Sequence, residues 1–66
     1  MEILLNGLPR QVEEGSTVLD LLRAEGLHER RLAIEVNLDI IPRASHATHV
    51  LRERDRVEVV QAIGGG

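Results

Sequence analysis

The chain opens with the stretch EILLNG at residues 2–7. This apolar-rich run ends in Asn6-Gly7, the dipeptide that most strongly favours a tight β-hairpin turn. We therefore expect a strand at 2–6 and a returning strand at 10–13. Pro9 would stand at the start of the returning strand, which predicts an edge strand, because a residue without an N–H group is tolerated there.

A helix is expected directly after this hairpin. Residues 15–17 predict a turn, with Thr17 as the N-cap and Asp20 close to the free N–H groups of the first helical turn. Gly26 is expected to end the helix, because glycine readily adopts the left-handed conformation after a last turn. Apolar residues recur at the spacing of one helix face, at Val18, Leu21 and Leu22.

The rest of the chain predicts more strands. We expect a buried strand at 32–36, a turn at 37–39, a short run at 40–42, an irregular connection with one helical turn at 43–48, a polar turn at 52–55 and a last strand at 56–62. This order predicts an α+β fold, a mixed sheet of four to five strands with one main helix across one face. The first and last strands should be parallel neighbours at the centre. The expected core is Ile3, Leu5, Val12, Val18, Leu21, Leu22, Ile34, Val36, Leu51, Val57 and Val59.

Composition excludes several function classes. The chain of 66 residues fits one domain that buries only about 60% of its unfolded surface, which leaves no room for a deep active-site cleft. It has no aromatic residue on which bases could stack, and its net charge of −3 has the wrong sign for neutralising phosphates. We therefore expect no nucleic-acid partner.

Metal, thiol and membrane functions are also not expected. Cysteine is absent, no apolar run approaches the roughly 18 residues of a membrane span, and no signal peptide is seen, so a cytoplasmic location is expected. His46 and His49 lack the further ligands of a zinc site, and Ser45 with a histidine lacks an orienting acid. We expect all three histidines, His28 included, to be solvated, with no metal site and no catalytic residue.

The glycine end is the feature without a structural explanation. Three successive glycines, Gly64 to Gly66, lose much conformational freedom on folding, so they do not stabilise a domain. They would form a thin arm that carries a carboxylate into a narrow channel of a partner. We expect a folded domain at 1–62 and a flexible glycine tail at 63–66. A merely frayed terminus is the alternative interpretation.

The chain resembles a known family along its whole length. The resemblance is to the thiamine-biosynthesis sulfur carriers of the ThiS family, whose fold is the ubiquitin-like β-grasp. Leu38 and Arg54 depart from the pattern, because glycine is usual at these turns. The residues that carry the resemblance are ILLNG at 3–7, Thr17-Val18 with Leu21-Leu22, AIEVN at 33–37, IPR at 41–43 and DRVEVV at 55–60 running into Gly64-Gly65-Gly66.

The resemblance implies a function for the glycine end. A partner related to ubiquitin-activating enzymes would use ATP and magnesium to adenylate the Gly66 carboxylate, and a protein persulfide would then convert it to a thiocarboxylate. Thiazole synthase would receive the sulfur. Ile63, Gly64 and Gly65 would form the partner-binding tail. The chain would be a monomeric cosubstrate rather than an enzyme, and it would bind no cofactor itself.

Two other functions remain open. Small subunits of molybdopterin synthase are sulfur carriers of similar fold, but they tend to be longer and have a Phe- and Pro-rich approach to the glycines, which residues 61–63 lack. A ubiquitin-like modifier or a plain interaction domain is the second alternative. All eight basic residues are arginine, so this chain offers no lysine for side-chain-linked polymers of itself.

Overall fold

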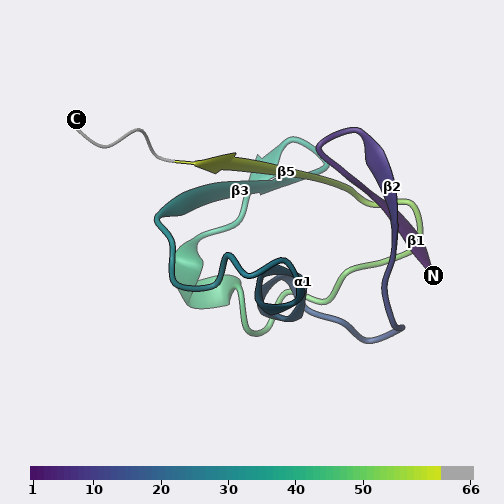
Figure 1. Ribbon diagram of the computed structural model, residues 1–66, viewed down its shortest axis with the longest axis horizontal. Coiled ribbons are helices and arrows are strands. Elements are labelled where there is room, and N and C mark those ends of the chain that lie inside the picture. Colours follow the sequence, from purple (N-terminus) through teal and green to yellow (C-terminus); the bar gives the residue numbers. More distant parts are fainter. Residues whose placement is uncertain (62–66) are drawn as a thin grey trace.

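The computed structural model describes residues 1–61 and folds them into a curved sheet with one main helix beneath it (Figure 1). The strand order is β2-β1-β5-β3-β4. β1 and β5 are parallel neighbours and the other pairs are antiparallel, which confirms the predicted topology. The elements are β1 (Glu2–Leu5), β2 (Leu8–Gln11), α1 (Val18–Ala24), β3 (Leu32–Val36), β4 (Asp39–Ile40), the 3-10 helix η1 (Arg43–Ser45) and β5 (Arg56–Gln61).

The core lies between α1 and one face of the sheet. Two of the expected core residues are only partly buried, Val12 just beyond the end of edge strand β2, and Val59. Val59 lies beyond Val57, the last residue of β5 that pairs with β1, and therefore nearer to the open end of the sheet. The buried apolar residues are Ile3, Leu5, Val18, Leu21, Leu22, Ile34, Val36, Leu51 and Val57, all of them expected.

The first hairpin turn has two residues. Asn6 and Gly7 both have positive φ, 50° and 82°, and the turn pairs Leu5 directly with Leu8. The returning strand therefore begins at Leu8 and not at residue 10, so the predicted boundary was wrong. Pro9 lies inside β2, where it is tolerated because β2 is the outermost strand and one of its edges needs no donor.

The second hairpin has the same turn geometry with a leucine in the place of the glycine. Asn37 and Leu38 have φ of 52° and 74°, and the turn pairs Val36 with Asp39. β4 is therefore Asp39–Ile40 and not the predicted run at 40–42. Arg54 also has a positive φ, of 68°. Both departures from the family pattern thus adopt the conformation that favours glycine, at a cost in strain.

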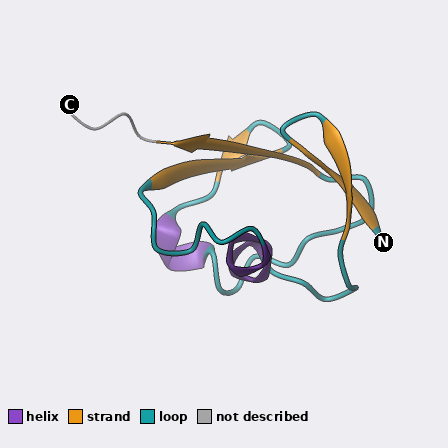
Figure 2. Ribbon diagram, in the orientation of Figure 1, coloured by secondary structure: helices purple, strands orange, loops and turns teal. Residues whose placement is uncertain are grey.

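Capping residues fix both ends of α1. The Thr17 hydroxyl accepts from Asp20 N–H at 3.1 Å, and the Asp20 carboxylate accepts from Thr17 N–H at 2.9 Å, as predicted. The backbone hydrogen bond from Thr17, followed by the side-chain bond, lowers the pKa of Asp20 from its ordinary value of 3.8. Gly26 has a φ of 72° just beyond the helix, which confirms it as the stop. The predicted helical turn at 43–48 is η1, drawn in purple beside α1 in Figure 2.

Candidate functional site at the end of β5

The candidate site is the surface around Gln61, the last described residue. β5 is the middle strand of the sheet, and its end lies far from the N-terminus (Figure 1). The residues predicted to carry the function, Ile63, Gly64, Gly65 and Gly66, follow this strand and lie outside the described residues. The described part of the site is therefore the platform from which residues 62–66 depart.

β5 is held along one edge up to its last residue. Its pairing with β3 extends from Val57, opposite Val36, to Gln61, opposite Leu32. On the other edge, β1 pairs with β5 only at Arg56 and Val57. The Asn6 side chain continues this edge, because its Oδ1 accepts from Val59 N–H at 2.8 Å. Sequence reasoning assigned Asn6 to the turn alone and missed this second role.

The sheet face away from α1 presents apolar and acidic side chains beside the end of β5. We call Ala33, Glu35, Ile40, Glu58 and Val60 the outer sheet face, because they form directly opposed pairs or alternate along their strands on that side. Val60 and Ile40 are 55% and 71% exposed. Glu35 and Glu58 are directly opposite each other, an arrangement of like charges that does not stabilise a sheet. The outer sheet face thus combines exposed apolar side chains with two opposed carboxylates.

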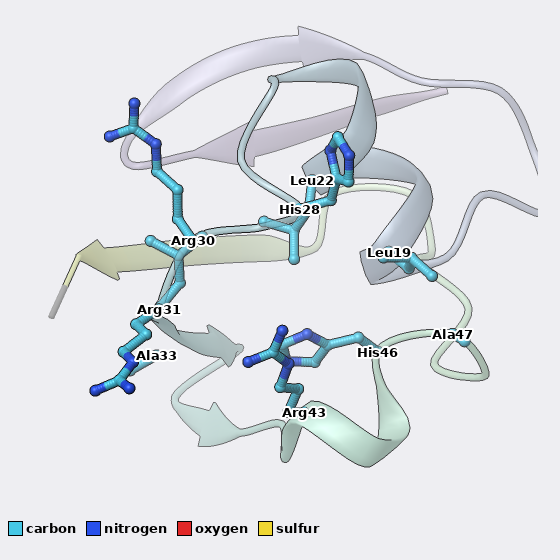
Figure 3. A pocket seen from close by; sticks show the side chains of 10 residues that line it. Leu19, Leu22, His28, Arg30, Arg31, Ala33, Arg43, His46 and Ala47 are labelled. Carbon is cyan, nitrogen blue, oxygen red and sulfur yellow. The ribbon is translucent and has the colours of Figure 1, made fainter.

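A groove of about 550 Å³ lies between α1, the loop before β3, and η1, and it adjoins the outer sheet face at Ala33 (Figure 3). Three arginines line it, and none of its lining residues is acidic. We call it the basic groove. Its lining residues are Leu19, Leu22, His28, Arg30, Arg31, Leu32, Ala33, Arg43, His46 and Ala47.

The prediction that His46 is a solvated loop residue is wrong. His46 is only 7% exposed, and its Nε2 lies 3.1 Å from the Ile41 carbonyl oxygen, so Nε2 donates a hydrogen bond there. The His46 carbonyl also accepts from Leu19 N–H at 2.9 Å, which ties this segment to the start of α1. His28 is exposed, as expected, and His49 is half-buried.

Within residues 1–61, no three His, Cys, Asp or Glu side chains gather where they could hold a metal ion. In that range, too, no helix has the length and apolar character needed to cross a membrane.

Comparison with known proteins gives consistent results. The model of the ThiS family matches residues 3–66. The sulfur carrier protein ThiS of Escherichia coli K12 is 33% identical over 66 residues, covering all of both chains. A crystal structure of the thiamine biosynthesis protein ThiS from Geobacter metallireducens superposes with a TM-score of 0.86, at 28% identity and full coverage of both chains. This match confirms the ubiquitin-like β-grasp fold.

Longer relatives contain a similar segment. Proteins named thiazole synthase from Magnetococcus marinus and Paramagnetospirillum magneticum are 41% and 38% identical over 66 residues. The whole of this chain is covered in each case, but it spans only 20% of the length of these two relatives.

Proposed function

The chain belongs to the ThiS family, and we propose that it acts as a sulfur carrier protein in thiamine biosynthesis. The observation that carries this proposal is the family match up to Gly66, which includes the glycine end in the shared pattern. The fold supports it, because the glycine end follows β5, the middle strand of the sheet, and β5 is paired with β3 up to Gln61.

The proposed chemistry takes place on the Gly66 carboxylate. A terminal carboxyl has a pKa of about 3.3–3.7, so it is ionised at neutral pH and is a poor electrophile. A separate adenylating enzyme, using ATP and magnesium, converts it to an acyl-adenylate and releases pyrophosphate. The terminal sulfur of a protein persulfide attacks the carbonyl carbon and displaces AMP. The product is an acyl disulfide between Gly66 and the donor cysteine. A thiol then attacks the sulfur of the donor cysteine and loses its proton, the S–S bond of the acyl disulfide breaks, a new disulfide forms on the donor, and the thiocarboxylate remains on Gly66.

Thiazole synthase is the proposed acceptor of this sulfur. In two relatives of that name, a segment similar to this whole chain makes up a fifth of the polypeptide, which supports a functional association between the two. Residues 62–66 can extend at most about 18 Å beyond Gln61, at roughly 3.3–3.6 Å per residue. A partner that receives Gly66 must therefore approach the strand end closely, where the outer sheet face offers Val60 as an apolar contact.

Deletion of Gly65-Gly66 tests the proposal. Glycines have no side chain for a core to bury, so the free energy of unfolding should change by no more than about 0.5 kcal/mol. ATP-dependent adenylation and sulfur transfer should both be lost. A deletion variant that unfolds, or one that still accepts sulfur, would contradict a carrier role for this end of the chain.

Partner choice separates this function from its nearest alternative. The intact chain should form a stable complex with thiazole synthase and none with the large subunit of molybdopterin synthase. Size-exclusion chromatography of equimolar mixtures gives this comparison directly. A complex with the molybdopterin enzyme alone would assign the chain to that pathway instead.

A further inference from the structure

The basic groove is not used by the chemistry proposed for Gly66. Its charged side chains, Arg30, Arg31 and Arg43, are exposed, and together they are three of the eight arginines in a chain of net charge −3. They come from two separate segments, the loop before β3 and the helical turn η1. The fold thus gathers positive charge in one place on an otherwise acidic protein.

The guanidinium groups of the groove are available to a ligand. In the described part of the chain, the one ion pair is Arg10–Glu25, at 3.0 Å and outside the groove. Figure 3 shows Arg43 reaching toward the groove from η1, while the side chains of Arg30 and Arg31 start at the opposite rim and extend outward, away from its centre. Arginines bind carboxylates through two parallel N–H···O hydrogen bonds, which makes acidic side chains suitable partners.

The floor of the groove is apolar. Leu19 and Leu22 reach it from α1, and Leu32 from the start of β3. Its three arginines are spread around the rim and do not converge on one point, as they would around a single phosphate group. This geometry suits an extended peptide segment that places an aliphatic side chain on the leucines and carboxylates on the rim.

The groove lies beside the described end of β5. Leu32 lines the groove and is also the residue of β3 that pairs with Gln61, the last residue of β5. A protein that receives Gly66 must approach this strand end, so the groove is within its reach. Complementary charge at such a contact orients the partners and speeds their association.

We propose that the basic groove docks an acidic segment of thiazole synthase. This inference rests on the proposed function, because thiazole synthase is its receiving partner. Docking in the groove would fix the orientation of the carrier on the enzyme independently of the outer sheet face, so that the residues after Gln61 enter the active site from a defined direction.

Charge reversal in the groove tests this inference. The variant Arg31→Glu/Arg43→Glu is compared with Arg52→Glu/Arg54→Glu, a matched control that makes the same charge change at exposed residues outside the groove. Binding of each to full-length thiazole synthase is measured by isothermal titration calorimetry at low and high salt. We expect the groove variant to bind at least about tenfold more weakly at low salt, and the control within about threefold of wild type.

A neutral variant and melting curves keep the test independent of folding. Arg31→Gln/Arg43→Gln should weaken binding less than the reversal, and all variants should melt at similar temperatures, since their side chains are exposed. Equal weakening by groove and control variants, or weakening of binding to the adenylating enzyme alone, would overturn the docking proposal and leave the carrier function intact. Failure of the wild-type chain to bind thiazole synthase would overturn both.

Discussion

Replacing Leu38 with glycine is expected to stabilise the protein. Leu38 has a φ of 74° in the second hairpin turn, and its side chain is 85% exposed. The left-handed conformation costs a residue with a Cβ roughly 1–2 kcal/mol, and glycine removes this strain. The greater conformational freedom of glycine in the unfolded chain lowers the free energy of unfolding by about 0.4–1 kcal/mol. The net gain should be about 0.5–1 kcal/mol, since little buried surface is lost.

Thermal unfolding followed by circular dichroism measures this gain. For a domain of this size, it corresponds to a rise in Tm of about 2–8 °C. Leu38→Ala is the control, because alanine keeps the Cβ and the strain while it removes nearly the same exposed side chain. Its Tm should stay close to that of wild type. A glycine variant no more stable than the alanine variant would refute the argument from turn strain.

Four other predictions address the core, the helix cap and β5. Val57→Ala should destabilise the fold by about 1–3 kcal/mol in urea unfolding and leave sulfur transfer intact, because Val57 is only 1% exposed. Thr17→Ala should cost about 1 kcal/mol at neutral pH. Because folding lowers the pKa of Asp20, its stabilising effect is present above about pH 4 and is lost as pH falls through the lowered value, so the gap in stability between wild type and Asp20→Asn should narrow in acid. Asn6→Gly keeps the turn but removes the acceptor for Val59 N–H, whose amide hydrogen should exchange faster.

Local signals explain why most of the fold could be predicted from sequence. The Asn6-Gly7 dipeptide sets the first hairpin, and Thr17 with Asp20 sets the start of α1, all through contacts between residues at most three apart. The predicted boundaries of β2 and β4 were wrong, because a two-residue turn pairs the residues on either side of it directly. Strand β2 therefore begins at Leu8 although Pro9 follows, and β4 begins at Asp39 although aspartate is uncommon in strands.

The features that could not be predicted from sequence depend on long-range contacts. Asn6 bonds to Val59, 53 positions away, and no local pattern marks that contact. His46 is buried because the loop after η1 packs against the start of α1, which its residue type does not indicate. The basic groove combines arginines from two segments, and each segment alone is an ordinary polar loop.

The state of the Gly66 carboxyl in cells that make thiamine tests the account most directly. Intact-mass measurement of the chain purified from such cells should show a fraction heavier by one exchange of oxygen for sulfur. This fraction should disappear when the adenylating enzyme is removed, because an unactivated carboxylate does not react with a persulfide. Chains found only unmodified, or only joined by amide bonds to larger proteins, would contradict the carrier function.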